Sequence, residues 1–322
     1  MSLKKGSKEK TKLHPRNKNR ERYDLKALAT SIPELEAFIQ PSKSGSTSID
    51  FSNPEAVRLL NKAILYHYYG ITYWDFPKEN LCPPVPGRAE YIHHVADLLS
   101  EYYDGAVPIG DGLTCLDVGV GASCIYPIIG VTAYGWRFIG SDIDPESIRH
   151  ARQIVKLNPV LNGKVVCKIQ HHSNAIFRGI VNQNDKIDIS ISNPPFHSSQ
   201  EDLQKGNKRK VKNLTGQKTA HARFNFSGNT NELIYKGGEY QFIKNMIGES
   251  RAISKSVFWF TTLVSKESNL KKVYKELVKY KAAEQRTIDI KTGNKTSRIV
   301  AWTYLNPAER KEWRENRWKN TI

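Results

Sequence analysis

The chain has 322 residues, 39% of them hydrophobic, which is enough apolar material for one large folded domain with an appendage. Its 49 Lys and Arg against 32 Asp and Glu give a formal net charge of +17, which favours a polyanionic partner, nucleic acid first. The chain has no run of about 18 apolar residues, the length needed to span a membrane, and nothing in it resembles a signal peptide. We therefore expect a cytoplasmic protein without a membrane partner.

Four cysteines are spread along the chain, at positions 82, 115, 124 and 167. They form no Cys-x-x-Cys pair and lie mostly in apolar runs, which is typical of reduced core residues. We therefore expect neither a disulfide framework nor a zinc site, and no other metal centre.

Residues 1–22 form a strongly basic first segment. Nine of them are Lys or Arg, only Glu9 and Glu21 are acidic, and hydrophobic residues are nearly absent. Such a segment cannot bury enough apolar surface to fold alone. A flexible arm that lies along phosphates is favoured here over a merely solubilising tail.

Residues 23–105 are predicted to form a helical extension. Asn53 followed by Pro54 is a typical helix start, because the Asn side chain can cap the first turn and proline fits there. Apolar residues follow at helical spacing until Gly70, which ends the pattern.

The stretch 81–88, Leu-Cys-Pro-Pro-Val-Pro-Gly-Arg, is predicted to be an ordered loop because it is rich in proline. It delivers Arg88 at the start of a helix that we expect from Ala89 to about Tyr103. A basic side chain is unfavourable against the dipole at a helix start. Arg88 is therefore a candidate ligand for a carboxylate, with an ordinary surface position as the alternative.

From residue 106 to residue 322 the pattern is that of an α/β domain with a doubly wound, seven-stranded, Rossmann-like sheet. Strands are expected at 113–118, 136–141, 164–169, 186–192, 257–264, 285–291 and 298–305. One helix is expected to follow the glycine turn and to end near Tyr134, and two more are expected at 145–157 and 269–280. A charged C-terminal helix at 308–319 is expected to dock on the core.

Residues 198–231 interrupt this alternation. Lys and Arg side chains stand there among Gly, Asn and Ser, together with Phe224 and Phe226. Basic residues interleaved with aromatic ones predict a basic lid beside the site that contacts nucleic acid. A disordered surface insertion is the alternative.

Ligands of such sheets bind at the carboxyl ends of the strands. Those ends hold Asp117-x-Gly119-x-Gly121, then Asp142, then Asn-Pro-Pro-Phe at 193–196. The third glycine of a dinucleotide-binding fingerprint is absent. In S-adenosylmethionine enzymes, an acid ends the first strand, glycines let the backbone approach the cofactor, and a second acid accepts the ribose hydroxyls. The combination therefore predicts S-adenosylmethionine as the cofactor.

The stretch 193–196 has a chemistry of its own. Its two prolines have no N–H to donate and hold the chain extended, so the carbonyls there are free to accept. The Asn193 amide oxygen is a second acceptor, and the Phe196 ring offers a flat apolar face. Two acceptors beside a stacking face suit a planar ring with an exocyclic NH₂, such as adenine. A simple strand-ending turn is the alternative.

Together these stretches are similar to those of a known family. The chain resembles the adenine-N6 methyltransferases that modify one adenine of 23S ribosomal RNA (the RlmF type), which have eukaryotic relatives acting on small nuclear RNA. The resemblance covers most of the chain, and its motifs lie at 14–17 (His-Pro-Arg-Asn), 22–24 (Arg-Tyr-Asp), 81–88, 117–127 and 193–197.

The resemblance implies a class I S-adenosylmethionine-dependent methyltransferase fold. It implies that the cofactor is held by Arg88, Gly119, Ser123, Asp142 and a residue near Ser173, for which Asn174 is the alternative. The pattern at the strand ends adds Asp117, Gly121 and Asn193 to this set. The resemblance also implies that the adenine is held by Asn193, Pro194, Pro195 and Phe196, which form the expected catalytic set.

We expect the Asn193 side-chain oxygen and the Pro194 carbonyl to accept both amine hydrogens, which would aim the nitrogen lone pair at the sulfonium methyl. Phe196 would stack on the base, and no general base is needed. The expected partner is 23S ribosomal RNA or its assembly intermediate, and the protein is expected to be a monomer. The alternatives are a guanine-N2 ribosomal RNA methyltransferase, a glutamine-directed protein methyltransferase and a non-catalytic RNA-binding module.

Overall fold

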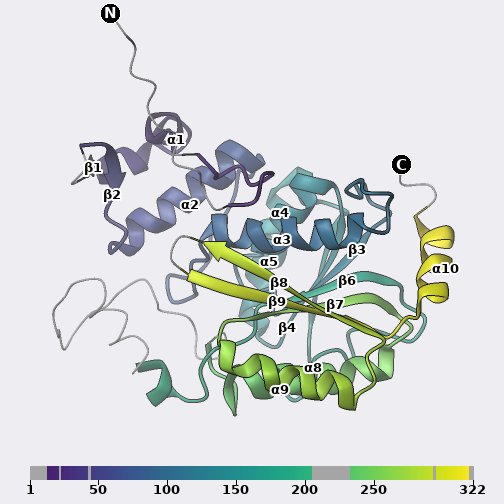
Figure 1. Ribbon diagram of the computed structural model, residues 1–322. Coiled ribbons are helices and arrows are strands. Elements are labelled where there is room, and N and C mark those ends of the chain that lie inside the picture. The colour runs from purple at the N-terminus through teal and green to yellow at the C-terminus, as the bar shows by residue number, and fades with distance from the viewer. Residues whose placement is uncertain (1–12, 22, 43–44, 205–232, 293–294, 319–322) are drawn as a thin grey trace, which may run out of the picture.

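A seven-stranded sheet between two layers of helices forms the body of the protein (Figure 1). The computed structural model describes residues 13–21, 23–42, 45–204, 233–292 and 295–318. The strand order is β5-β4-β3-β6-β7-β9-β8, in which β3 to β7 run parallel and β8 and β9 are antiparallel to their neighbours. The predicted seven-stranded, doubly wound sheet is confirmed.

The strands lie close to their predicted places. Their bounds are β3 Thr114–Val118, β4 Arg137–Asp142, β5 Val165–Ile169, β6 Ile187–Ser192, β7 Val257–Val264, β8 Glu284–Thr292 and β9 Lys295–Thr303. In β6 and β7 every residue is buried, as expected for parallel strands covered by helices on both faces.

Each face of the sheet has its own hydrophobic core. One face is covered by α3 (Val85–Ser100), α4 (Ile125–Tyr134) and α5 (Pro145–Leu157), the other by α8 (Gly238–Ser250) and α9 (Glu267–Lys279) (Figure 1). In β9 the alternation is regular, because Ile299 and Ala301 join the first core while Val300 and Trp302 join the second.

The N-terminal extension is helical, as predicted, and also holds a small hairpin that was not predicted. It consists of α1 Leu25–Ser31, a 3₁₀ helix Pro33–Phe38, β1 Ile39–Pro41, β2 Thr47–Ile49 and α2 Pro54–Tyr69. Helix α2 begins and ends as expected, since the Asn53 side chain accepts from the N–H groups of Glu55 and Ala56, and Gly70 closes the helix at φ 66°.

The expectation that residues 81–88 form a loop is wrong for residues 85–88. Helix α3 begins at Val85, with Pro84 at its N-cap and Pro86 in its first turn. A proline is tolerated there because the N–H groups of a first helical turn have no partner within the helix. Arg88 therefore lies inside α3, and its backbone N–H donates to the Pro84 carbonyl at 3.2 Å.

Residues 13–21 of the predicted flexible arm are docked on α3, so the expectation of flexibility does not hold for them. The buried Asn17 amide donates to the buried Glu90 carboxylate at 2.6 Å, and the His14 N–H donates to the same oxygen at 2.9 Å. The Arg16 guanidinium donates to the Tyr134 hydroxyl at 2.8 Å. Residues 1–12 lie outside the described residues, as does 205–232, most of the predicted lid.

Three side chains at this docking point, His14, His94 and Asp97, have ligand atoms close enough to hold a metal ion. The backbone N–H of Arg16, however, donates to Nδ1 of His14 at 3.1 Å, which leaves the ring proton on Nε2, where it donates to Asp97 at 2.7 Å. This tautomer has no free lone pair for a metal. We therefore interpret the cluster as a hydrogen-bonded contact that fixes residues 13–21 on α3.

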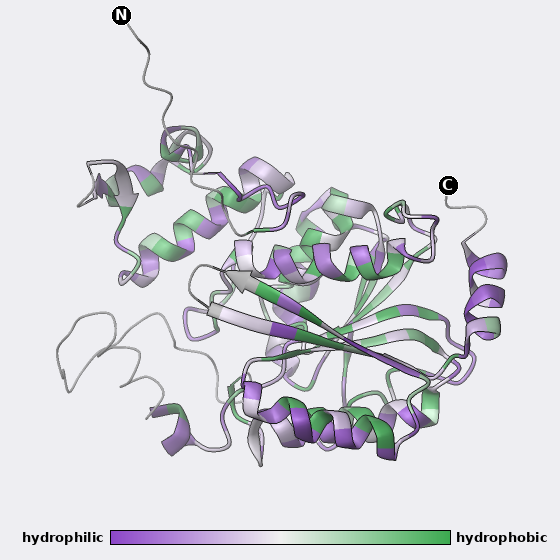
Figure 2. Cartoon of the chain, viewed as in Figure 1, coloured by the Kyte–Doolittle hydropathy of each residue, from purple (hydrophilic) through white to green (hydrophobic). Residues whose placement is uncertain are grey.

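A buried carboxylate anchors the C-terminal helix α10 (Pro307–Arg317), which is coloured hydrophilic over most of its length (Figure 2). Asp188 in β6 is fully buried and accepts from the indole N–H groups of Trp313 and Trp318, both at 2.8 Å. It also accepts from the Thr114 N–H at 2.7 Å and the Arg317 guanidinium at 3.0 Å. The predicted docking of this helix is confirmed.

No helix within the described ranges combines the length and the apolar character that a bilayer crossing requires.

Replacing Asp188 by Ala should lower the free energy of unfolding by about 3–5 kcal/mol, because it leaves the Arg317 charge and two buried N–H groups without their acceptor. Chemical denaturation measures this loss. The matched control is Asp111→Ala, which breaks an exposed ion pair with Arg137 and should cost less than about 1 kcal/mol. Equal losses for the two variants would contradict the role of Asp188 as an anchor.

Candidate active site

The carboxyl ends of three neighbouring strands open into one cavity. In the sheet, Val118 of β3 pairs with Ser141 of β4 on one side and with Ser192 of β6 on the other. The glycine loop, Asp142 and Asn193 follow these residues directly, so the parallel register brings the three predicted motifs to the same edge.

Most of the predicted site residues line this cavity, namely Arg88, Gly119, Gly121, Ser123, Asp142, Ser173, Asn193 and Pro195. Asp117, Pro194 and Phe196 are not among the residues that line it. Of the two alternatives in the loop after β5, Ser173 lines the cavity and Asn174 does not.

The Asp142 carboxylate fixes the glycine loop. One oxygen accepts from the Gly121 N–H at 2.9 Å and the other from the Asp144 N–H at 3.0 Å. Gly119 lies at φ 81°, a conformation that a side chain would strain, which is why the loop needs glycine there. The carboxylate thus lies at the cavity wall with its position set by the backbone.

Asp117 is a buried carboxylate without a hydrogen-bond partner among the described residues. Its side chain is fully buried, and neither carboxylate oxygen meets a donor. Burial raises the pKa of the Asp117 carboxyl well above its usual range; the Asp142 charge adds to the rise and the Arg88 guanidinium opposes it. An uncompensated acid beside a cavity is costly to the fold and is typical of a functional site.

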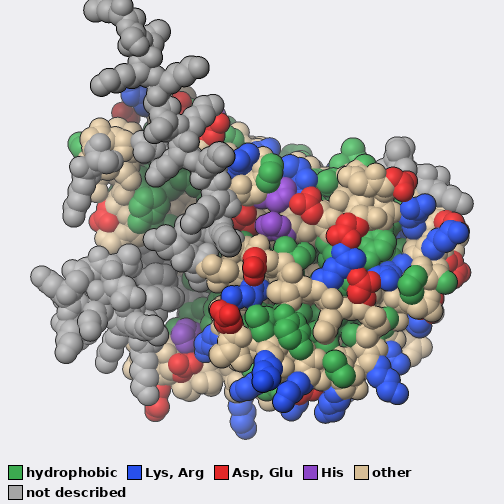
Figure 3. All heavy atoms as spheres, viewed as in Figure 1, with side chains coloured by type: hydrophobic (Ala, Val, Ile, Leu, Met, Phe, Trp, Pro, Cys, Tyr) green, Lys and Arg blue, Asp and Glu red, His purple; other side chains and the backbone are tan. Residues whose placement is uncertain are grey.

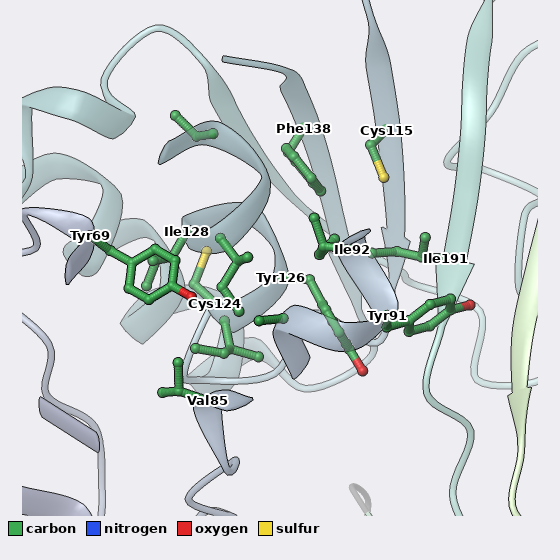
Figure 4. Close-up of a cluster of buried hydrophobic side chains, with 14 of the residues drawn as sticks. Tyr69, Val85, Tyr91, Ile92, Cys115, Cys124, Tyr126, Ile128, Phe138 and Ile191 are labelled. Carbon is green, nitrogen blue, oxygen red and sulfur yellow. The ribbon is translucent and has the colours of Figure 1, made fainter. Parts of the chain in front are cut away.

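Arg88 faces the same region from helix α3. Its Nη1 donates to the Tyr126 hydroxyl at 3.0 Å, and its guanidinium lies 5.6 Å from the centre of that ring. Figure 4 shows Tyr126 within the cluster of buried hydrophobic side chains. Since only one guanidinium N–H has an acceptor in the described part of the chain, the others can bind an anionic group.

Asn193 follows β6 and presents a free acceptor. Its Oδ1 is buried and meets no donor among the described residues. The strand end before it is fixed by Tyr91, whose hydroxyl accepts from the Ser192 N–H at 3.2 Å and is hydrogen-bonded to Thr261 at 2.8 Å. Figure 4 shows Tyr91 beside Ile191 of this strand. Asn193 is thus held on a rigid support with its oxygen unsatisfied.

The loop after β5 is fixed by a carboxylate from α8. Glu249 accepts from three consecutive backbone N–H groups, those of Ile176 at 2.9 Å, Phe177 at 2.9 Å and Arg178 at 3.3 Å. From the inner side, the Gln170 amide donates to the Arg178 carbonyl at 2.9 Å. The cavity wall formed by this loop therefore depends on a helix that follows the basic insertion.

The cavity-lining residues that were not predicted include Ile234, Tyr235 and Phe242, which lie far along the chain from the predicted motifs. They come from the end of the insertion and from α8, which was not predicted either. The only local signal was the apolar triplet at 233–235 after a long polar stretch. They reach the cavity through tertiary contacts, which residue spacing does not reveal.

The comparisons with known proteins give a consistent picture. A family model described as RNA methyltransferase matches residues 7–306. A protein of Yersinia enterocolitica named ribosomal RNA large subunit methyltransferase F is 48% identical over 312 residues, covering 97% of this chain and 93% of the relative. A protein of Cytophaga hutchinsonii with the same name is 47% identical over 310 residues, covering 96% of each.

Two solved structures are similar over nearly the whole chain. The hMettl16 catalytic domain in complex with MAT2A 3′UTR hairpin 1 is 27% identical with a TM-score of 0.77, covering 92% of this chain and 96% of that one. The N-terminal domain of human METTL16 in complex with SAH is 25% identical with a TM-score of 0.71, covering 91% and 99%.

Replacing Glu249 by Ala should release the loop after β5, because three backbone N–H groups lose one charged acceptor. Hydrogen exchange followed by mass spectrometry should show residues 176–178 exchanging about tenfold to a hundredfold faster. The control Glu267→Ala removes an exposed carboxylate that pairs with Arg298 and should leave this loop unchanged. Unchanged exchange in the Glu249 variant would show that the loop holds its shape without this contact.

Proposed function

This chain belongs to a family of RNA methyltransferases, and on that premise we propose that it methylates N6 of one adenine in 23S ribosomal RNA. The sheet is that of the class I methyltransferases, the cofactor is S-adenosylmethionine, and the substrate is RNA. The names of the relatives favour the RNA of the large ribosomal subunit. The observation that carries the choice of an amine as target is the buried, unpartnered Oδ1 of Asn193 at the end of β6.

The residues present fit the cofactor. We assign the Arg88 guanidinium to its carboxylate, the Asp142 carboxylate to its ribose hydroxyls, and the negative field of Asp117 to its ammonium and sulfonium charges. The unpartnered oxygens of Asp117 and the open N–H groups of Arg88 support this assignment. Gly119, Gly121, Ser123 and Ser173 line the cavity and complete the proposed binding set.

When bound, the cofactor supplies an electrophilic methyl group, and the chain supplies orientation. An aromatic amine is a poor nucleophile because its lone pair is conjugated into the ring. We assign Asn193 Oδ1 and the Pro194 carbonyl as acceptors of the two amine hydrogens, which draws the nitrogen towards tetrahedral geometry. The rate then comes from positioning and electrostatics, without a strong general base.

The target base has to leave its stack to reach the cavity, so an unpaired or flippable adenine in structured RNA is the expected substrate. Exposed Lys side chains on α9, at positions 271, 272, 275 and 279, offer contacts to phosphates, and Figure 3 shows basic side chains over this part of the surface. Whether free 23S RNA or an assembly particle is modified, the proposed setting is the cytoplasm. A monomer suffices, because one chain supplies every assigned residue.

Cofactor binding should release protons, because burial raises the pKa of the Asp117 carboxyl in the free protein and a cationic ligand beside it lowers that pKa again. Affinity should therefore rise with pH over the range in which the Asp117 carboxyl of the free protein loses its proton. Calorimetry with S-adenosylmethionine in two buffers of different ionisation enthalpy measures the proton count. Asp117→Asn should abolish the release, whereas a release of equal size in that variant would assign the proton to another group.

Replacing Asn193 by Ala should lower turnover by about 10²–10³-fold, because one of two preorganised acceptors of the amine is lost. Thermal stability should change little, since Oδ1 has no partner in the described structure. Methyl transfer to large-subunit ribosomal RNA, followed by nucleoside mass spectrometry, measures both rate and product. The exposed Asn182→Ala variant is the control.

The same assay tests the proposed function itself. N6-methyladenosine in 23S RNA is the expected product. Guanine methylated at N2 would favour the rival ribosomal enzyme, and a methylated glutamine in a ribosomal protein would favour the protein methyltransferase. RNA binding without any product would favour the non-catalytic module.

A further inference from the structure

Residues 233–235 lie alongside the segment that follows Asn-Pro-Pro-Phe. The His197 N–H donates to the Leu233 carbonyl and the Tyr235 N–H donates to the His197 carbonyl, both at 3.0 Å. His197 and Ile234 form a parallel β-bridge between them. This backbone pairing joins Tyr235 to the segment that follows Asn193, and both residues contribute to the lining of the cavity.

The Tyr235 side chain is held in one orientation. The Asn245 amide N–H donates to its hydroxyl oxygen at 2.7 Å, and the Gln241 amide donates to the Asn245 oxygen at 2.8 Å, which fixes which end of the Asn245 amide faces the tyrosine. The ring also packs edge-to-face on Phe242, with centroids 5.2 Å apart. Such support from α8 is more than a surface tyrosine needs.

The hydroxyl of Tyr235 is available as a hydrogen-bond donor. Its oxygen already accepts from Asn245, and within the described residues no acceptor takes its own hydrogen. The residues that line the cavity therefore include one hydroxyl donor without an acceptor in the described structure, that of Tyr235, and one acceptor without a donor there, Asn193 Oδ1.

We propose that Tyr235 contributes to the specificity for adenine, because its hydroxyl donates a hydrogen bond to a ring nitrogen next to the target amine. In adenine the N6 amine is flanked by N1 and N7, which are both acceptors. In guanine the N2 amine has an acceptor, N3, on one side only and an N1–H donor on the other, so guanine suits the tyrosine donor in just one orientation of its ring, and in the other orientation both donors are left unpaired. The inference rests on the proposed function and gives one physical reason for the site to prefer adenine to guanine.

This assignment complements the expected role of Phe196. That residue is half-buried and is not among those lining the cavity, and its carbonyl accepts from the Lys266 ammonium at 3.4 Å. Tyr235 and Phe242 provide the aromatic surface that lines the cavity on this side.

The first test compares Tyr235→Phe with Tyr240→Phe. The first variant keeps the ring and loses only the hydroxyl; the control loses a hydroxyl that contacts Glu276 outside the cavity. We expect kcat/KM for RNA methylation to fall at least tenfold in Tyr235→Phe and to stay unchanged in Tyr240→Phe. Calorimetry should give both variants the wild-type affinity for S-adenosylhomocysteine, which a general structural defect would alter.

The second test replaces single atoms of the target base. Once the modified position is mapped in the wild-type product, RNA carrying 1-deazaadenosine or 7-deazaadenosine there lacks one acceptor each. The wild-type enzyme should lose at least tenfold activity on one of the two, and Tyr235→Phe should lose no further activity on that analogue.

The outcomes distinguish a failure of the role of Tyr235 from a failure of the proposed function. A wild-type product on adenine together with wild-type kinetics for Tyr235→Phe would overturn the role of Tyr235 and leave the proposed function intact. Equal sensitivity of both enzymes to each analogue would also overturn it. A wild-type product on guanine would overturn the proposed function first.

Discussion

The parallel register of β4, β3 and β6 is the constraint on which the site depends. Because Val118 pairs with Ser141 and with Ser192, three segments separated by many residues in sequence end at one edge of the sheet. The glycine loop, Asp142 and Asn193 then need no long loops to meet. A shift of one residue in either pairing would turn the side chains of that strand to the opposite face and disperse the site.

The charged side chains at this edge of the sheet destabilise the fold but suit the binding of a charged ligand. Burial and the nearby Asp142 charge both disfavour ionisation of Asp117, and Asp117 has no donor in the described structure. Arg88 offsets part of this cost from α3. We propose that a ligand with a cationic centre and a carboxylate offsets more of it, so that a site poorly satisfied by itself suits S-adenosylmethionine.

Elements with a local pattern could be predicted from the sequence. The predicted bounds of β7, Val257–Val264, and of α5, Pro145–Leu157, agree with the structure, because an apolar run and a capped amphipathic helix each carry their own signal. The start of α3 was missed since its prolines indicate a loop, although a first turn tolerates them.

Features created by tertiary contacts could not be predicted. Residues 13–21 are polar and basic, and nothing in their sequence predicts that Asn17 will donate a hydrogen bond to the buried carboxylate of Glu90. Tyr235 lies about forty residues beyond Asn193, with the basic insertion between, and reaches the site only through backbone pairing with His197. In both cases the partner, and not the residue itself, decides the position.

We propose that one cavity at the end of the sheet holds the cofactor with its sulfur facing Asn193 Oδ1, the proposed acceptor of the target amine. A crystal structure of the complex with S-adenosylhomocysteine tests this most directly. We expect the amino-acid end of the ligand between Arg88 and Asp117, its ribose hydroxyls on Asp142, and its sulfur turned towards Asn193. A ligand bound elsewhere, or reversed so that its ribose meets Arg88, would contradict it.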